Sequence, residues 1–404
     1  MTTRKPPVPP KRVYVLGAGF SYGAGYPLQR DVLHRIESLG IMDAPVGPVE
    51  RFINSQATIV RFLAHAFPKD MPPSLEDLFT LLDQTIDTEG YFAGRSWENL
   101  NEVRDQLKRA VLFLLHAAGE AVPTGVAKFY RSIAAHLVSL RLAAGQENDS
   151  FSIISLNWDT LLEDSIYWCI HKMGVLKKVD VDYCCYTTPF DTTYPHTPSI
   201  LQRAKRIFNI KVLKLHGSAN WLRCPNCNRL FTGLGRLQNV WDEYVEPRLC
   251  PNCQQQSVRR RQQTQPYLEP FFITPTFVKV FDNAHIQMIW HNAYVELAEA
   301  TEVVFIGYSL PEADYHLRTL LRRAINPDAS IVVVLTKHDR PHKNTDDRLR
   351  RFLASSRYKG FFGEKRVKFN YSGTQGYFEE VLDIRSLRSQ LKGLREQFRK
   401  TFRK

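Results

Sequence analysis

The sequence predicts an α/β protein with a mostly parallel sheet, a helical insertion and a small zinc ribbon held by four cysteines. Three observations lead to this fold class. Short apolar runs alternate with helical patterns in the second half of the chain. The first such run is followed by roughly a hundred residues of helical pattern. Two near-identical Cys-x-x-Cys pairs lie close together in the chain.

The expected strands are continuous apolar runs rather than alternating ones. Runs of this kind are typical of a sheet that is covered on both faces, as parallel sheets are. They fall at residues 12–16, 151–155, 211–215, 271–273, 302–306 and 330–335. Helical patterns at 160–171, 283–300 and 313–324 follow several of these strands and would cover the sheet.

Between the first two strands the pattern is helical from Pro27 to Gln146, with little strand character. Residues 74–77 follow two prolines and resemble a capping box that opens one helix. The stretches 97–118 and 127–144 carry apolar residues at helical spacing. We therefore expect a core at 12–45, 149–220 and 264–380, a helical insertion at 46–148, a ribbon at 221–263 and a terminal helix at 381–404.

The composition favours a protein of the cytoplasm. The chain has 404 residues, of which 44% are hydrophobic, enough for a sizeable core. No apolar run approaches the ~20 residues of a membrane span, and the first residues do not resemble a signal peptide. Seven cysteines, an odd number, argue against a complete set of disulfides. We expect no membrane span.

The net charge of +13 is concentrated at the C-terminus, where residues 385–404 contain eight Lys or Arg and one Glu. The remaining chain is only mildly basic, so the net charge is poor evidence for a nucleic-acid partner, which stays open. The basic run at 259–261 could contact nucleic acid, but a solvated turn is favoured. Leu and Phe fall at helical steps in the tail, which predicts an amphipathic helix. This helix could dock on its own domain, join subunits, lie on an anionic surface or bind an activator such as a partner ATPase. We expect a homo-oligomer.

A glycine-rich turn directly follows the first strand, at Gly17, Ala18 and Gly19, with Ser21 close behind. Glycines let the backbone approach a phosphate, and a following helix N-terminus would favour the negative charge. The same residues could form only a tight turn between strand and helix. The spacing differs from the Gly-x-Gly-x-x-Gly of dehydrogenases, and no acidic residue ends a second strand about twenty residues later. A hydride-transfer enzyme is therefore disfavoured.

Two Cys-Pro-Asn-Cys sequences predict a zinc site. Cys224 and Cys227 form one pair, Cys250 and Cys253 the other, and 22 residues separate the pairs. Two such pairs supply the four thiolates of a tetrahedral zinc ion, and a full set of thiolates leaves no open position, so the Zn²⁺ would be structural. The alternative is a pair of redox-active or disulfide-forming motifs.

Four segments in this order resemble motifs of the sirtuins, the silent information regulator family of NAD-consuming enzymes. Residues 17–21 are similar to their Gly-Ala-Gly-x-Ser phosphate loop, and residues 156–159 to their Gln-Asn-Ile-Asp segment. Residues 214–218 resemble their His-Gly segment, with the zinc ribbon directly after, and residues 305–310 resemble their Gly-Thr-Ser-Leu segment. The resemblance covers residues 12–335 and is particular to the bacterial defence-type subgroup with a helical insertion. It implies a Rossmann-like sheet of sirtuin type.

The resemblance also implies roles for individual side chains in cleaving NAD. Asn157 would be catalytic, because its uncharged amide can bind a ribose hydroxyl or orient water beside an oxocarbenium-like sugar. His216 would accept a proton, since imidazole has a pKa near ~6.5. Asp159 would bind the carboxamide of nicotinamide. The phosphates and ribose would be held by Gly17, Ala18, Gly19, Ser21, Gly307 and Ser309.

Simpler roles remain open for the same residues. Asn157 could cap the helix that follows it, and Asp159 could favour the first turn of that helix. His216 could merely end a strand.

Three departures from the sirtuin pattern bear on the reaction. Residues 25–31 differ from the Pro-Asp-Phe-Arg cofactor loop, so the family arginine's role is not assigned to Arg30. Residues 269–276 stand where deacylases pair with an acylated peptide, and two prolines remove amide hydrogens from this segment. Residues 336–339 lack the asparagine expected for the adenosine ribose.

Without a peptide groove, water would attack the ribose. We therefore expect a NAD⁺ glycohydrolase that releases nicotinamide and ADP-ribose, and the resemblance implies an antiviral defence role through NAD depletion. A NAD-dependent protein deacylase or an ADP-ribosyltransferase is the alternative. A non-catalytic sensor of NAD or ADP-ribose is the second alternative.

Overall fold

The computed structural model describes residues 10–38, 49–68, 70–144, 149–176, 178–189, 208–232, 249–254, 266–276, 283–312, 314–340 and 353–381. The predicted terminal helix lies outside these ranges apart from its first residue, Val381. The basic run at 259–261 also lies outside them.

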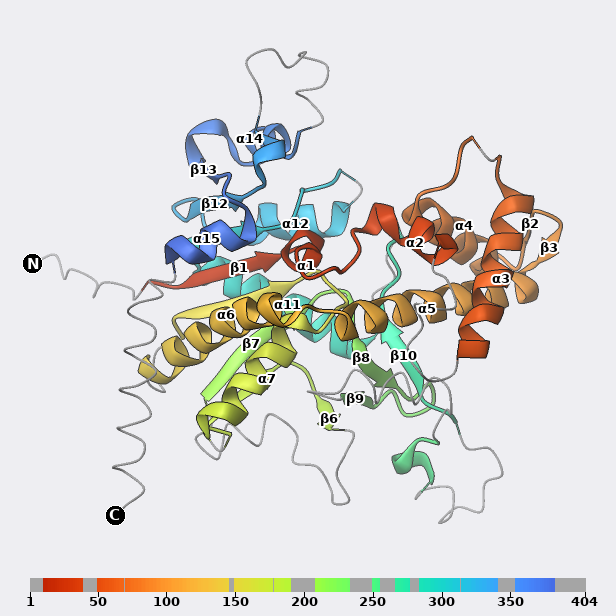
Figure 1. The fold of residues 1–404 in the computed structure, drawn as a ribbon, viewed down its shortest axis with the longest axis horizontal. Coiled ribbons are helices and arrows are strands. Elements are labelled where there is room, and N and C mark those ends of the chain that lie inside the picture. Colours follow the sequence, from red (N-terminus) through yellow and green to blue (C-terminus); the bar gives the residue numbers. More distant parts are fainter. Residues whose placement is uncertain are drawn as a thin grey trace, which may run out of the picture.

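Among the described residues, seven strands form a parallel sheet at the centre of the molecule (Figure 1). The strand order is β13-β12-β11-β1-β4-β7-β5, and neighbouring strands are parallel throughout. The strands are β1 (Arg12–Leu16), β4 (Phe151–Ser155), β5 (Val179–Asp182), β7 (Phe208–Lys214), β11 (Glu302–Ile306), β12 (Ser330–Val334) and β13 (Val367–Asn370). The apolar runs of β1, β4 and β11 are buried almost completely, as a sheet covered on both faces requires.

Helices cover both faces of this sheet. One face carries α6 (Thr124–Ala143), α7 (Leu161–Met173) and α15 (Gly373–Val381), and the other carries α11 (Ala284–Glu299), α12 (Tyr315–Ala324) and α14 (Ala354–Phe362). Tyr14 of β1 contacts Phe378 of α15. Phe305 of β11, one register position further along, points to the opposite face and contacts Tyr358 of α14. The predicted α/β fold class is confirmed.

The chain between β1 and β4 is mainly helical. It contains α1 (Ala18–Tyr22), α2 (Val32–Ser38), α3 (Val49–Ala66), α4 (Leu75–Asp87), a hairpin of β2 (Tyr91–Phe92) and β3 (Arg95–Ser96), α5 (Trp97–Glu120) and α6. The capping box is confirmed, because Ser74 and Asp77 exchange hydrogen bonds between side chain and backbone at the start of α4. In Figure 1, α3, α4 and the hairpin extend beyond the sheet, whereas α6 packs against α7. Within the described ranges no single helix is long and apolar enough to cross a membrane. Helices α5 and α6 have the required length and hydropathy only when they are taken together, and they are bent by 95° relative to each other.

One predicted strand belongs to a different sheet. Residues 271–273 were expected beside the other apolar runs, but β10 (Glu269–Phe272) pairs antiparallel with β8 (Gly217–Arg223). Among the described residues this second sheet has the order β10-β8-β9-β6, with β9 at Leu230–Thr232 and β6 at Thr187–Pro189. Pro270 gives a physical reason for this placement. Proline lacks an amide hydrogen and is tolerated on edge strands, and β10 lies at the edge of the second sheet.

The sequence pattern missed the two outer strands of the main sheet, β5 and β13. Their sequences, Val-Asp-Val-Asp and Val-Lys-Phe-Asn, alternate apolar and polar residues. Only β13 is partly exposed, so it does not need a continuous apolar run. β5 is mostly buried, and its Asp182 is accommodated because it accepts hydrogen bonds from the Cys184 amide and from Nδ2 of Asn209.

Candidate functional site

The carboxyl ends of the central strands open into a cavity of about 900 Å³. Its walls come from the turns after β1, β4, β7, β11 and β12 and from helices α4 and α5. In open parallel sheets this is the edge at which ligands bind, beside the strand where the order of the sheet reverses. The volume is within the range of small-molecule sites. The predicted site residues that line it are Gly17, Ala18, Gly19, Asn157, Asp159, His216, Gly307 and Ser309.

The glycine loop and the turn after β11 pack directly against each other. The Gly19 amide donates to the Gly307 carbonyl at 2.9 Å, and the Gly17 amide donates to the Ile306 carbonyl at 3.0 Å. A Cβ on Gly17 would lie 2.6 Å from the Gly307 oxygen, and a Cβ on Gly307 would lie 2.1 Å from the Phe20 nitrogen. Glycine is therefore required because two backbones meet here, and this meeting forms one wall of the cavity.

Ser21, the remaining predicted binding residue, lies behind this wall and is 1% exposed. Its hydroxyl oxygen is 3.3 Å from Nδ2 of Asn157. It also hydrogen-bonds the carboxyl of Asp159. Ser21 therefore contacts Asn157 and Asp159 from behind the cavity wall.

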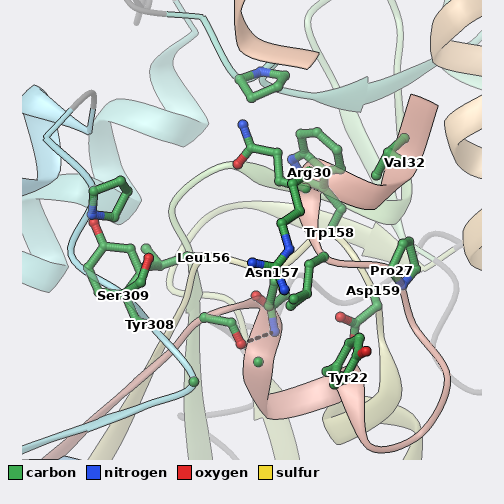
Figure 2. Close-up of a pocket in the computed structure, with 18 of the residues that line it drawn as sticks. Tyr22, Pro27, Arg30, Val32, Leu156, Asn157, Trp158, Asp159, Tyr308 and Ser309 are labelled. Atoms are coloured by element: carbon green, nitrogen blue, oxygen red, sulfur yellow. Dashed lines mark hydrogen bonds between the residues drawn. The ribbon is translucent and has the colours of Figure 1, made fainter. Parts of the chain in front are cut away.

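Asn157 is held by the glycine loop. Its Nδ2 donates to the Gly17 carbonyl at 3.0 Å (Figure 2) and faces Ser21. Because a carbonyl can only accept, this contact fixes the orientation of the amide and leaves Oδ1 to accept hydrogen bonds from another group. The helix α7 begins at Leu161 with Thr160 as its N-cap residue, so Asn157 does not cap it.

Asp159 is buried at the floor of the cavity. Its Oδ1 accepts a hydrogen bond from the Leu161 amide at 3.2 Å, which is the helix-start role that the sequence left open. Burial raises the pKa of Asp159 above its ordinary value, and the positive charge of Lys214 acts against this rise.

His216 follows β7 and faces the same cavity. Its Nδ1 lies 3.3 Å from the Leu156 carbonyl, which can only accept, so Nδ1 carries the proton in the neutral ring. Nε2 is then the nitrogen that can accept a proton. The backbone is held as well: the Ile273 amide donates to the His216 carbonyl at 2.8 Å.

Several cavity residues were not assigned from the sequence. Arg30 lies in the short 3₁₀ helix Gln29–Asp31 before α2 and extends over the cavity toward Asn157 (Figure 2); its side chain is 80% exposed. At the other end the cavity is lined by the turn after β12 and by the start of α15, which follows β13. These residues are Thr336, His338, Asp339, Gly373 and Thr374. The place of Gly373 and Thr374 could not be foreseen because β13 was not recognised.

The helices between β1 and β4 also contribute to the cavity. The start of α4 supplies Ser74, Leu75 and Glu76, and α5 supplies Val111, Leu114 and Leu115. The loop after β10 is attached to α4, because Thr274 Oγ1 donates to Asp83 Oδ2 at 2.9 Å. Asp83 in turn pairs with Arg104 of α5 at 3.3 Å.

The four cysteines come together as predicted. Their sulfur atoms all lie within 4.8 Å of one another, and the Cys224–Cys253 and Cys227–Cys250 sulfurs are 3.7 Å apart. A tetrahedral ion with Zn–S bonds of ~2.3 Å places its sulfurs ~3.8 Å apart, whereas a disulfide would bring them to ~2.05 Å. The cluster therefore fits a structural zinc ion. It joins the end of β8 to the chain before β10, on the strand pair that begins next to His216.

Comparison with known proteins gives structural likeness only. No protein-family model and no curated protein sequence matches the chain. Over nearly its whole length the chain is similar to Sir2 structures. They include a mutant Sir2 homologue with 2′-O-acetyl ADP ribose (13% identity, TM-score 0.40, 96% of this chain and 92% of that one) and a Sir2 homologue–NAD complex (13% identity, TM-score 0.38, 96% and 90%). A third is a Sir2–p53 peptide–NAD⁺ complex (11% identity, TM-score 0.37, 93% of each chain).

Proposed function

We propose that this chain is a sirtuin-like NAD⁺ glycohydrolase, which cleaves NAD⁺ with water to nicotinamide and ADP-ribose. The observation that carries the proposal is the placement of Asn157 and His216 at the ends of neighbouring strands. Both line one cavity together with the glycine loop, as the sirtuin resemblance of these motifs implies.

The hydrogen-bonding atoms of these two residues suit the reaction. Oδ1 of Asn157 can accept a hydrogen bond from a ribose hydroxyl or from water, because Nδ2 is occupied by Gly17. Nε2 of His216 can accept a proton, because Nδ1 faces the Leu156 carbonyl. Arg30 offers a cation at the cavity mouth that suits a phosphate group.

The reaction balances with water alone. The bond between C1′ of the ribose and the nicotinamide nitrogen breaks, and nicotinamide leaves as a neutral ring with the bonding electrons. A water oxygen forms the new bond to C1′, and the water proton passes to His216 or to solvent. Asp159 would hold the carboxamide of the leaving group.

Water is favoured as acceptor because the segment that would pair with a peptide has few amides available. Between Glu269 and Thr276, Pro270 and Pro275 have no amide hydrogen. The amides of Ile273 and Thr276 donate within the chain, to the carbonyls of His216 and Thr274. The hydrogen bond from Thr274 to Asp83 of α4 further ties this segment to the protein.

The test is to incubate purified protein with NAD⁺, with and without an acylated peptide, and to measure nicotinamide. We expect release without peptide, and loss of at least a hundredfold in Asn157→Ala and His216→Ala, the order of magnitude of general acid–base catalysis. Release that requires peptide would favour the deacylase, and binding of NAD⁺ without turnover would favour the sensor. Lys211→Met, a change on β7, the strand before His216, but outside the cavity, is the control.

The biological role that goes with this activity is defence by NAD depletion. The protein expressed in bacteria should lower cellular NAD during phage infection, and Asn157→Ala should not. Unchanged NAD in infected cells that contain active protein would remove the defence role while leaving the enzymatic proposal intact.

A further inference from the structure

Lys214 and Glu163 form a fully buried ion pair beneath the candidate site. Nζ of Lys214 is 2.8 Å from Oε1 of Glu163, and the side chains are 0% and 2% exposed. Taking two charges out of water is so unfavourable that well-packed apolar side chains of the same volume are often equally stable. Stability of the fold therefore gives no sufficient reason for a charged pair at this place.

The second contact of Lys214 connects it to the site. Nζ donates to the carbonyl oxygen of Asp159 at 2.6 Å. Lys214 is the last residue of β7, two residues before His216, and Asp159 comes two residues after Asn157. The ammonium group thus joins the turns that carry the two candidate catalytic residues.

Two further hydrogen bonds link the segment 156–159 to His216 and to β8. The Ala219 amide donates to the Trp158 carbonyl at 2.8 Å, and Nδ1 of His216 faces the Leu156 carbonyl. These contacts already fix the spacing of the two turns through neutral groups. What Lys214 adds is a positive charge placed against the end of the segment that contains Asp159.

We propose that Lys214, balanced by Glu163, is a positioning residue for NAD⁺ cleavage that keeps the carboxyl of Asp159 ionised and its turn in place. An ionised Asp159 can accept the hydrogen bonds of a carboxamide NH₂, whereas a protonated carboxyl has lost part of that capacity. This inference rests on the proposed function, because it concerns the leaving-group side of the same cavity.

The charges around Asp159 agree with this assignment. Burial raises its pKa most, Lys214 lowers it, and Glu163 on α7 raises it. The neighbouring Tyr26 and Tyr130 have pKa values raised by burial and by the charge of Asp159, so both phenols stay neutral. The hydrogen bonds that Asp159 receives also lower its pKa; they come from Ser21 and from the Leu161 amide. Among these groups Lys214 is the one whose positive charge lowers the pKa of Asp159.

The variant to test is Lys214→Met combined with Glu163→Gln. It removes both charges together and keeps the volumes, so the fold is not left with one buried charge. An opposite charge within a few ångströms typically lowers a carboxyl pKa by about one to three units. The double variant differs from Glu163→Gln alone only in the charge of Lys214. Its acid limb of kcat/KM for nicotinamide release should therefore lie at higher pH than that of Glu163→Gln by about one unit or more, with activity recovering above that limb. Equal loss of activity at every pH would overturn the inference, because it would indicate a purely structural role.

The matched control is Lys211→Met, which makes the same change three residues earlier on β7. Lys211 pairs with Asp149 and Glu296, outside the cavity, so its removal should leave the pH profile in place. A profile that moved equally in both variants would also overturn the inference.

A second measurement separates this inference from the proposed function. The carbonyl stretch of a protonated buried carboxyl can be followed by infrared titration without substrate and assigned to Asp159 by its loss in Asp159→Asn. We expect the band to persist to higher pH in the double variant than in Glu163→Gln, which keeps the charge of Lys214. If the native protein releases no nicotinamide but the band moves, the proposed function fails and the action of Lys214 on Asp159 stands. If the band does not move, the inference fails whatever the turnover.

Discussion

Replacing Gly307 by alanine tests whether the glycine loop is shaped by the contact between two backbones. Gly307 has φ +64, and an added Cβ would lie 2.1 Å from the Phe20 nitrogen and 2.3 Å from the Gly19 carbonyl carbon. Both neighbours are backbone atoms of the loop that lines the cavity, so no side-chain rotation can make room. The loop or the turn after β11 must move.

The magnitude has two parts. A residue with a Cβ in the left-handed region costs about 1–2 kcal/mol relative to glycine. Forcing an extra carbon into a packed region costs about 1–3 kcal/mol more. The expected loss is about 2–5 kcal/mol, a large share of the ~5–15 kcal/mol that holds a typical domain together.

Gly174 provides the matched control. It ends α7 with φ +68, nearly the same backbone conformation, but an added Cβ would meet nothing within 4 Å. Gly174→Ala should therefore show the conformational part alone, about 1–2 kcal/mol.

The assay is urea unfolding of both variants, followed by titration with NAD⁺. We expect Gly307→Ala to unfold at a clearly lower urea concentration than Gly174→Ala and to bind NAD⁺ more weakly. Equal midpoints for the two variants would refute the reasoning, because the close approach of the two backbones would then carry no energetic weight.

Three further predictions follow from the same contacts. Purified protein should contain a single zinc ion per four-cysteine cluster, and Cys250→Ser should release it and lower the melting temperature; zinc-free protein of unchanged stability would contradict the site. Burial raises the pKa of Asp159 in the folded protein, so its protonated form stabilises the fold below the unfolded pKa of ~3.9, and this contribution is lost as the pH rises through the folded pKa. Asp159→Asn should therefore unfold at a higher urea concentration than the native protein at about pH 8, and at nearly the same concentration at about pH 4. The variant should also lose activity. An equal difference in urea midpoint at both pH values would show that the ionisation of Asp159 does not contribute to stability. Thr274→Val removes the 2.9 Å hydrogen bond to Asp83 and should lower the free energy of unfolding by about 1 kcal/mol, and no change in the urea midpoint would show that this attachment is not stabilising.

The candidate site could be predicted closely because its residues follow strands that the sequence reveals. Asn157 and His216 come after β4 and β7, and the carboxyl ends of parallel strands meet at one edge of the sheet. The residues that were not assigned depend on features with no local signal. Arg30 lies in a single 3₁₀ turn, Gln29–Asp31, which has no distinct sequence pattern, and Gly373 follows an edge strand that is not a continuous apolar run.

The sequence by itself determined the parallel sheet, the four-cysteine cluster and the glycine loop, because each rests on a short pattern with a local physical cause. Apolar runs must be buried, two Cys-x-x-Cys pairs can close on one ion, and glycine permits close approach of backbones. Only the tertiary structure decided which partners those residues have. It placed β10 in the second sheet, turned the glycine amides toward the turn after β11, and buried Lys214 against Glu163 and the Asp159 carbonyl. Such contacts join residues far apart in the chain, and their geometry follows from the packing of the whole molecule rather than from any one segment.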